Sequence, residues 1–485
     1  MPCSHCVVHL IFLCVVSHAS LPALCQQLRA GAAKAVITPA LRSGTVYLAG
    51  FGHDRIATGI NDDLYVRCVA LQAGGNTVVL CAADLIGLFH SNVLKIRRRF
   101  SAQVPGNAFL VVACTHTHAG PDAIGLWGPT ARQTGVDKDY LDKTERLIAD
   151  TALRAVRSMQ PARMQLGRDD HPLLGSLQGV DRPPYVKDPF LFAMRLIAVS
   201  TGQTIATIVN WSDHPETLGR GNTAMTADYP HWLCGYLERK VGELAVFFSR
   251  AVGKVSPLGS DVVLQDPETG AIAQDGTWLK ARLLGTTIGE LAVRALQSGE
   301  TAVPDQISVQ STQVFVPLRN ERFRLADAIG IFGDRRPLFT NKELDSSFHD
   351  STIEGIGAVR LPLGNEIETE VDYVQLRAGH RVLAEIVTVP GEIYPELVNG
   401  GMVRYPGADY PDAPFEPVLR SHLKSRYQFV LGLANDEIGY LIPKAEWDDQ
   451  PPWLQNRPER WYGEINSVGP DAAGAVLRAL VSLTK

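Results

Sequence analysis

The sequence predicts an α/β protein with mixed β-sheets flanked by helices, built as a single large catalytic domain. Short, continuously apolar runs typical of buried strands alternate with longer stretches whose apolar residues recur at helical spacing. No repeat and no low-complexity linker divides the 485 residues, which are enough for one large domain. Because strands and helices alternate along the chain, the α/β class is favoured over an all-α or all-β fold.

The individual elements follow from these runs. Residues 92–102 and 140–159 are predicted to be helices, the first with a basic face. The polar, arginine-rich stretch 319–370 fits the pattern poorly, and the sequence leaves open whether it is an inserted lid or a solvated loop region. The predicted strands cover residues 77–82, 108–113, 204–209, 244–248, 382–389 and 428–431.

The N-terminus resembles a signal peptide. Residues 7–16 form an apolar run too short to span a bilayer, and the run ends near Ala19 in small residues that suit a signal-peptidase cut. No Lys or Arg precedes the run, which departs from the usual pattern. We therefore expect a signal peptide over residues 1–19, one folded domain over 26–485, and a secreted or periplasmic protein.

Charge and cysteine content narrow the function class. The formal net charge is −5 with no long block of like charge, which argues against a nucleic-acid partner. Beyond the leader, Cys68, Cys81, Cys114 and Cys234 form no Cys-x-x-Cys pair, so a zinc ribbon or a redox motif is disfavoured. The apolar surroundings of the first three favour buried free thiols, although export would permit a disulfide.

Four predicted strands end in polar clusters that contain metal-ligand side chains. Ligands of α/β proteins gather at strand ends, where loops converge on a rigid sheet. Two histidines and a glutamate from separate strand ends suit a catalytic zinc with an open position for water. The strands and their clusters are 108–113 with His116 and His118, 204–209 with His214, 382–389 with Glu392, and 428–431 with Tyr440.

The residues alone leave a structural reading of each cluster open. In an extended segment, side chains alternate between faces, so one of His116 and His118 suffices for a metal and the other is free for acid–base work. His214 could equally be a hydrogen-bonded polar residue, and Glu392 a surface acid in a turn. Other classes of catalytic site are disfavoured, because the sequence lacks a Gly-x-Ser-x-Gly elbow, a phosphate loop, a dinucleotide fingerprint and a His-Glu-x-x-His helix.

Five segments, in the same order, resemble the neutral (alkaline, non-lysosomal) ceramidases. The run Cys-Thr-His-Thr-His-Ala-Gly-Pro at 114–121 resembles the most specific motif of that family, Thr-His-Thr-His-Ser-Gly-Pro. The resemblance covers nearly the whole mature chain but not the family's C-terminal β-sandwich-like domain, which we expect to be lacking. The other segments are 33–39, the opening strand; 253–257, Gly-Lys-Val-Ser-Pro; 389–392, Val-Pro-Gly-Glu; and 434–440, Ala-Asn-Asp-Glu-Ile-Gly-Tyr.

The resemblance implies specific roles for eight residues. His118 is expected beside the metal as an acid–base or polarising group, and Ser256 near the scissile bond. Tyr462 resembles an active-site tyrosine and Arg182 a substrate-contacting arginine. Lys254 departs from the family, because it stands where an Asp is usual. The implied zinc ligands are His116, His214, Glu392 and Tyr440.

The function implied is zinc-dependent hydrolysis of ceramide to a sphingoid base and a fatty acid by a metal-activated water. Tyr462 and Arg182 would help zinc to stabilise the oxyanion, and His118 would protonate the leaving amine. We favour water over Ser256 as the nucleophile, because no Asp or His is visibly paired with that serine in the sequence; capping its loop is the structural reading of Ser256.

Two other functions stay open. The missing C-terminal domain motivates a zinc hydrolase of another N-acyl amide, and Lys254 motivates a non-catalytic binding protein on the same fold. The expected partners are a lipid substrate and a membrane surface contacted peripherally, with no obligate protein partner.

Overall fold

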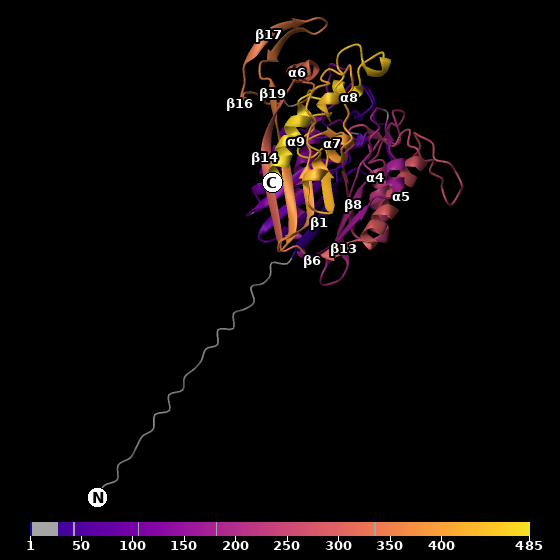
Figure 1. The fold of residues 1–485 in the computed structure, drawn as a ribbon, viewed down its shortest axis with the longest axis vertical. Helices are drawn as coiled ribbons and strands as arrows, with labels where there is room; N and C mark the ends of the chain where they lie inside the picture. Colours follow the sequence, from indigo (N-terminus) through magenta and orange to yellow (C-terminus); the bar gives the residue numbers. More distant parts are fainter. Residues whose placement is uncertain (2–27, 42–43, 105, 181, 334–335) are drawn as a thin grey trace.

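The computed structural model describes Met1 and residues 28–41, 44–104, 106–180, 182–333 and 336–485. Apart from Met1, the predicted signal peptide lies outside these residues. Two large β-sheets form the centre of the molecule (Figure 1).

The larger sheet has nine strands and mixed polarity. Its strand order is β11-β9-β8-β6-β1-β3-β4-β5, with β13 also paired to β6. The pairs β4–β5 and β9–β11 are parallel, and the others are antiparallel. The strands are β1 (Arg29–Val36), β3 (Tyr65–Ala73), β4 (Asn76–Ala83), β5 (Ala108–Cys114), β6 (Gln160–Asp169), β8 (Leu191–Ala198), β9 (Thr204–Trp211), β11 (Leu244–Ser249) and β13 (Glu300–Ala302).

The second sheet has six strands. Its order is β16-β15-β19-β20-β22, and β14 also pairs with β19, along nearly the whole length of that strand. Only the pair β20–β22 is parallel, so this sheet is mixed as well. The strands are β14 (Gln306–Pro317), β15 (Leu338–Thr340), β16 (Glu343–Leu344), β19 (Glu366–Ala378), β20 (Arg381–Thr388) and β22 (Tyr427–Leu431).

The two sheets pack against each other, and helices cover their outer faces. Apolar side chains of both sheets form one shared core. The outer face of the larger sheet packs against two helix pairs, and that of the second sheet packs against α9, the yellow helix in Figure 1. The predicted class, α/β with mixed sheets flanked by helices, is therefore confirmed. The helices are α1 (His90–Ser101), α2 (Lys138–Arg157), α4 (Tyr229–Lys240), α5 (Trp278–Gln297) and α9 (Ala472–Leu483).

Strand β3 carries apolar side chains on both of its faces, in a run interrupted by Arg67 and Gln72. Val69 and Leu71 point into the core between the sheets, whereas Val66, Cys68 and Ala70 point toward α1 and α2. Successive side chains of a strand alternate between faces, so a strand covered on both sides needs apolar residues on both faces. The predicted strands and helices all correspond to observed elements with ends shifted by a few residues, namely α1, α2, β4, β5, β9, β11, β20 and β22.

The remaining elements are short, and several of them position the candidate site. Several of the short strands pair with a strand far away in the sequence, as β21 does with β23. The strands are β2 (Gly59–Ile60), β7 (Gly179–Val180), β10 (Ala224–Met225), β12 (Val255–Ser256), β17 (Phe348–Ile353), β18 (Gly357–Pro362), β21 (Glu392–Ile393) and β23 (Tyr440–Leu441). The helices are α3 (Pro172–Ser176), α6 (Glu321–Ala328), α7 (Pro395–Asn399) and α8 (Tyr462–Ile465).

The stretch 319–370 is more ordered than a solvated loop. It contains α6, β15, β16 and the hairpin β17–β18, which projects from the upper end of the molecule in Figure 1. Its Phe323 and Phe332 contact each other edge to face, with ring centroids 5.7 Å apart. Its role as a lid stays a prediction.

One pair of cysteines corrects the expectation of free thiols. Cys68 and Cys81 face each other on neighbouring strands, with Cα atoms 4.1 Å apart, and form a disulfide. Their register brings them together, since directly opposed residues of an antiparallel pair are within bridging distance. Cys114 is free and buried, as expected, and Cys234 is free and buried as well. None of the helices in the described ranges has the length and apolar character that a membrane span requires.

Candidate metal centre

Four strand ends meet at one point and bring together the four predicted metal ligands. His116 follows β5, His214 follows β9, and the parallel pair β21–β23 places Glu392 directly opposite Tyr440. Glu392 Oε2 lies 2.9 Å from His214 Nε2 and 3.4 Å from His116 Nε2. All four side chains belong to buried residues.

The other ring nitrogen of each of these histidines is committed to the backbone. Nδ1 of His116 is 2.6 Å from the carbonyl oxygen of Ile86, and Nδ1 of His214 is 2.6 Å from that of Val255. A carbonyl oxygen only accepts, so each Nδ1 carries a hydrogen, and each ring presents an Nε2 lone pair once it is neutral. These lone pairs face Glu392, which is also an acceptor.

Three acceptor atoms that converge in a buried place require a cation between them, either a proton or a metal ion. Two imidazole nitrogens and a carboxylate oxygen form a donor set that suits zinc, and a ligand histidine normally donates its other N–H to a carbonyl or carboxylate. The residues therefore fit a zinc ion.

His118 lies beside this set. One nitrogen of each of His116, His118 and His214 lies within 4.8 Å of the others, so the three buried rings can hold a metal ion. His118 differs from its neighbours because its Nδ1 faces a carboxylate, Glu216 Oε2, at 3.1 Å.

Burial and the neighbouring charges together raise the pKa of His214 and Tyr440 and lower that of His118. Burial by itself would lower the pKa of His214, but its hydrogen bond to Glu392 and the charges of Glu216 and Glu392 raise it to about 9. For His118 burial prevails over the opposing effect of Glu216 and lowers the pKa to about 4. Burial, followed by the charge of Glu392, raises the pKa of the Tyr440 phenol well above its usual value. His118 and Tyr440 are therefore neutral near pH 7.

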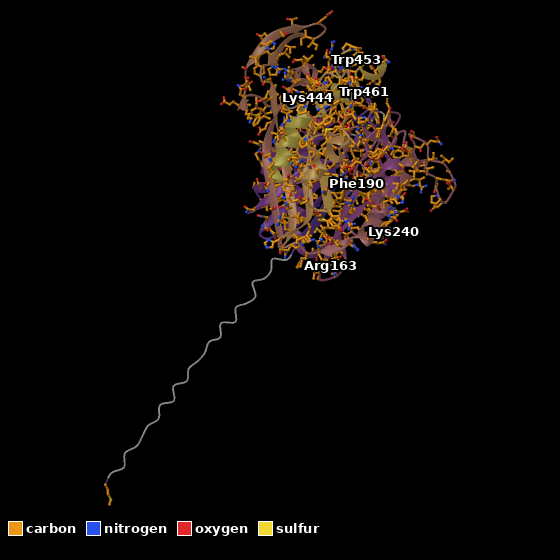
Figure 2. All side chains as sticks on the ribbon, in the orientation of Figure 1. Arg163, Phe190, Lys240, Lys444, Trp453 and Trp461 are labelled. Atoms are coloured by element: carbon orange, nitrogen blue, oxygen red, sulfur yellow. A yellow bond between two sulfur atoms is a disulfide. The ribbon has the colours of Figure 1, made fainter. Side chains whose placement is uncertain are left out.

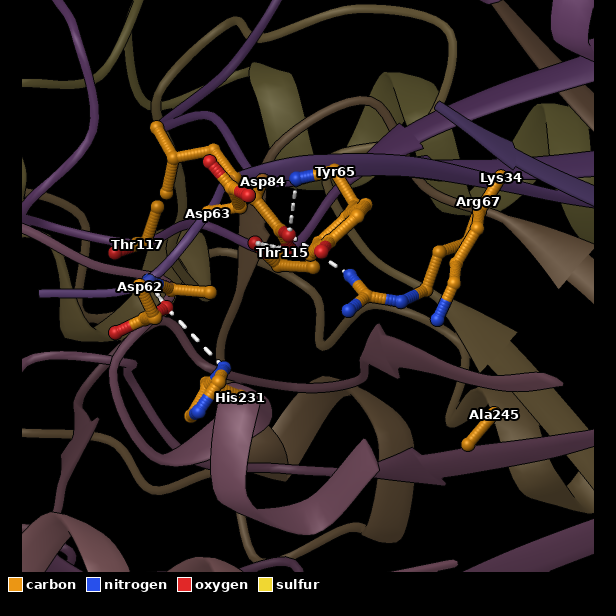
Figure 3. Close-up of polar contacts among 12 residues, drawn as sticks. Lys34, Asp62, Asp63, Tyr65, Arg67, Asp84, Thr115, Thr117, His231 and Ala245 are labelled. Atoms are coloured by element: carbon orange, nitrogen blue, oxygen red, sulfur yellow. Dashed lines mark hydrogen bonds and ion pairs between the residues drawn. The ribbon is translucent and has the colours of Figure 1, made fainter. Parts of the chain in front are cut away.

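A hydrogen-bond network around Asp84 fixes the segment that carries His116. Asp84 is buried and accepts hydrogen bonds from the Tyr65 backbone at 2.8 Å, from Arg67 at 2.9 Å and from the Thr115 hydroxyl at 3.2 Å (Figure 3). His116 itself adopts a left-handed conformation with φ of 70°. Such a conformation is unfavourable for a residue with a side chain and persists where the surroundings over-determine it, as these hydrogen bonds do.

Gly50 forms the wall behind His118. It has a φ of +110°, and a Cβ at this position would lie 2.5 Å from His118 Cγ. We expect Gly50→Ala to displace the His118 ring and to lower kcat about a hundredfold, because misplacement of a reacting group by about 1 Å has effects of this size. Steady-state kinetics of the zinc-loaded protein measure the effect.

Gly59→Ala is the matched control, since a Cβ there meets no atom within 4 Å. Equal kcat values for the two variants would contradict the role given to Gly50.

Ser256 has a carboxylate partner that the sequence did not reveal. Its hydroxyl donates to Glu216 Oε1 at 2.5 Å, and Glu216 is also the partner of His118. Glu216 was missed because it lies 40 residues before Ser256. The available signal was its place two residues after His214, in the polar cluster that follows β9.

Tyr462 and Arg182 have different surroundings. Tyr462 lies in α8 and is 56% exposed, and its ring meets that of Tyr440 edge to face at a centroid distance of 5.9 Å. Arg182 is buried; its Nη1 lies 2.7 Å from Glu464 Oε2 and its Nη2 donates to the Glu446 carbonyl at 2.5 Å. The structure thus brings Tyr462 to the site and places Arg182 in a separate buried network, outside the lining of the cavity.

A narrow, mostly apolar cavity of about 80 Å³ opens from the histidines. Tyr462 lies on its wall, next to Trp461 at the upper end of the molecule in Figure 2. Glu437 is a second functional candidate that the sequence did not single out: burial, followed by the charge of Glu392, raises its pKa well above the usual value and so favours its protonated form. The apolar lining includes Ile86, Phe89, Ile124, Leu126, Trp127, Leu318, Phe323, Phe332, Leu338, Ile367, Ile438 and Val468.

The fold, but not the sequence as a whole, has counterparts among known proteins. No protein-family profile and no curated protein matches the chain. The crystal structure of the neutral ceramidase from Pseudomonas aeruginosa is similar with a TM-score of 0.64 and 17% identity, covering 95% of this chain and 74% of that one. A ceramidase complexed with C2 is similar with a TM-score of 0.66 and 17% identity, covering 95% and 75%. The chain therefore has a neutral ceramidase-like fold.

Proposed function

We propose that this protein is a zinc-dependent hydrolase that cleaves the amide bond of ceramide into a sphingoid base and a fatty acid. The observation that carries the proposal is the convergence of His116 Nε2 and His214 Nε2 on Glu392 Oε2, at 3.4 and 2.9 Å. The similarity of the fold to two ceramidase structures supports the choice of reaction.

His116, His214, Glu392 and Tyr440 would hold the zinc. When bound, zinc lowers the pKa of a coordinated water to near 7 and polarises the carbonyl of the amide. Tyr440 has to lose its phenolic proton to become a ligand, because burial and Glu392 keep it protonated otherwise.

His118 moves the proton in the reaction. Since burial lowers its pKa to about 4, it enters the reaction neutral and must accept a proton before it can donate one. It takes the proton of the attacking water as the new C–O bond forms, and passes it to the amide nitrogen as the C–N bond breaks. Tyr462, next to Tyr440, donates a hydrogen bond to the carbonyl oxygen. Arg182 has no part in this step, because its guanidinium is paired with Glu464.

Metal affinity is expected to rise with pH. Below about pH 9 the metal-free His214 carries a proton that the metal has to displace, whereas His118, with a pKa of about 4, adds no proton in this range. Because Tyr440 also loses its phenolic proton on binding, zinc affinity should increase about a hundredfold per pH unit between pH 7 and 9 and about tenfold per unit just above pH 9. Competition with a chromophoric chelator measures it, and a flat profile between pH 7 and 9 would contradict the assignment of His214.

The narrow cavity favours a second candidate, the hydrolysis of another N-acyl amide with a short acyl chain. A volume of about 80 Å³ accepts roughly six water-sized groups. Phe332 from the stretch 319–370 closes part of the cavity, and its ring meets Phe89 edge to face at 5.3 Å.

Truncation of Phe332 is expected to admit longer chains. In Phe332→Ala, the ratio of kcat/KM for N-palmitoyl-sphingosine to that for N-hexanoyl-sphingosine should rise at least about tenfold, because each further methylene that enters the cavity gains burial. Phe315→Ala is the control, since Phe315 packs against Phe339 and does not line the cavity. An unchanged ratio in Phe332→Ala would show that Phe332 does not limit chain length.

A panel of amides separates the two candidates. Zinc-loaded protein is incubated with ceramides of graded acyl length and with N-acyl amino acids, and the released amine is quantified. Release of sphingoid base supports ceramide hydrolysis; release of amine only from other amides supports the second candidate. No release from any amide by protein with bound zinc would overturn the proposed reaction.

Export and membrane contact belong to the same proposal. The disulfide between Cys68 and Cys81 supports an oxidising compartment, because such bonds are rare in the cytosol. Peripheral contact with a lipid surface would give access to ceramide, and the upper end with α6, α8 and the hairpin β17–β18 is the end that carries the cavity wall (Figure 1).

A further inference from the structure

We infer that Glu216 is a positioning residue that fixes the tautomer and the direction of the His118 ring, with Nδ1–H toward the carboxylate and the Nε2 lone pair toward the metal centre. The inference rests on the proposed metal site and deepens the account of its reaction.

The contacts of His118 are unlike those of the other two histidines. Its Nδ1 is 3.1 Å from Glu216 Oε2, whereas His116 and His214 point Nδ1 at backbone carbonyls. Both ring nitrogens are buried, and in the described part of the chain neither makes a hydrogen bond of good geometry, so the 3.1 Å approach of Nδ1 to Glu216 is an electrostatic contact and Nε2 faces the cluster without a partner. Its ring centroid lies 5.0 Å from that of His116 and 5.3 Å from that of His214, so the ring is part of the same cluster.

In all three rings Nδ1 faces an oxygen that accepts hydrogen bonds. A carbonyl oxygen and an ionised carboxylate both only accept, so each Nδ1 carries the hydrogen and each Nε2 is left with a lone pair. Glu216 accepts the Ser256 hydroxyl at Oε1 and turns Oε2 toward His118 Nδ1, so both of its oxygens are placed as acceptors. At metal centres the outer ring N–H of a histidine is commonly oriented by a carboxylate or by a backbone carbonyl. Glu216 would have for His118 the role that the carbonyls of Ile86 and Val255 have for His116 and His214.

Glu216 is itself held at both oxygens. Oε1 accepts the Ser256 hydroxyl at 2.5 Å, and Ser256 is fixed in β12, which pairs with β7. The backbone N–H of His118 donates to the Pro215 carbonyl at 3.1 Å, so the two segments are also joined next to the carboxylate. On its other side, the His118 ring meets Phe51 edge to face at 5.0 Å and abuts Gly50. The ring is thus enclosed, and the Glu216 carboxylate is the group that selects its tautomer.

Nitrogen NMR of the zinc-loaded protein with labelled histidines tests this directly. The His118 signals, assigned by their loss in His118→Gln, should show the Nδ1–H tautomer in the unmodified protein. In Glu216→Ala they should change to the Nε2–H tautomer or to a mixture. Ser256→Ala is the matched control: it removes the other partner of Glu216, and the Nδ1–H tautomer should persist. A His118 tautomer that is the same with and without Glu216 would overturn the inference.

Kinetics provide a second readout. Glu216→Ala should lower kcat about 10–100-fold with little change in KM, as the loss of an orienting outer partner does. Combined with His118→Ala, it should add little to the loss caused by His118→Ala alone, because both act through one ring. Losses that multiply would contradict the inference. If the unmodified protein hydrolyses no amide, the proposed function fails, while the tautomer measurement still decides the role of Glu216.

Discussion

Replacement of His214 by alanine is expected to abolish stoichiometric zinc binding and to lower amide hydrolysis at least about a thousandfold, since a direct ligand should count for more than the 10–100-fold typical of an outer partner. His214 supplies the nitrogen nearest to Glu392, at 2.9 Å, and it is held by the Val255 carbonyl at 2.6 Å. Its loss removes one of the two neutral donors that face the carboxylate. Elemental analysis of the purified variant and steady-state kinetics measure both effects.

His380→Ala is the matched control for this variant. His380 is exposed and follows β19, away from the four strand ends that meet at Glu392. Its zinc content and kcat should equal those of the unmodified protein. Retention of one zinc per chain in His214→Ala would remove His214 from the ligand set.

Lys254→Asp is expected to destabilise the fold by at least about 3–5 kcal/mol, the usual result of breaking a buried ion pair. Lys254 Nζ lies 2.6 Å from Glu396 Oε1, and both side chains are almost completely buried. Burial and the charge of Glu396 already raise the pKa of the neighbouring Glu446 to about 9. An Asp at position 254 would therefore place a further acid where two buried acids already interact unfavourably. The midpoint of urea unfolding measures the loss.

A double variant provides the control. Lys254→Met with Glu396→Gln removes both charges and keeps side chains of similar length, and replacement of a whole buried pair is far less harmful than removal of one partner. It should unfold at a higher urea concentration than Lys254→Asp. If Lys254→Asp unfolds at the same urea concentration as the unmodified protein, Glu396 is not the group that requires a lysine.

This pair also explains the departure from the resembling family. Lys254 stands two residues before Ser256, at the position where the resemblance leads us to expect an Asp. In the structure the Lys254 ammonium donates a hydrogen bond to Glu396, whereas the Ser256 hydroxyl donates one to Glu216. The two side chains therefore belong to different networks, and the lysine does not disturb the serine.

The features that could be predicted are those with a local signature. Strands covered on both faces need continuous apolar runs, so β4, β5, β9 and β20 were apparent from composition alone. The metal-ligand residues His116, His214 and Glu392 stand shortly after such runs in the sequence. Their convergence in space could therefore be expected from the positions of the strand ends. The stretch 319–370 was harder, because its hairpin β17–β18 is largely exposed and carries little apolar alternation.

The features that could not be predicted depend on contacts between distant residues. Arg182 meets Glu464 across 282 residues, and Ser256 meets Glu216 across 40. Such pairs leave no periodicity or spacing in the sequence. The disulfide between Cys68 and Cys81 depends on the register of two strands, which is fixed by the pairing of the whole of β3 with β4.

Crystals of the protein loaded with zinc, measured on both sides of the zinc absorption edge, test the central claim most directly. The account predicts a single anomalous peak bounded by Nε2 of His116, Nε2 of His214 and the carboxylate of Glu392, with Tyr440 beside it. Absence of a peak there, in crystals of protein that still hydrolyses amides, would contradict the metal centre on which the proposed function rests.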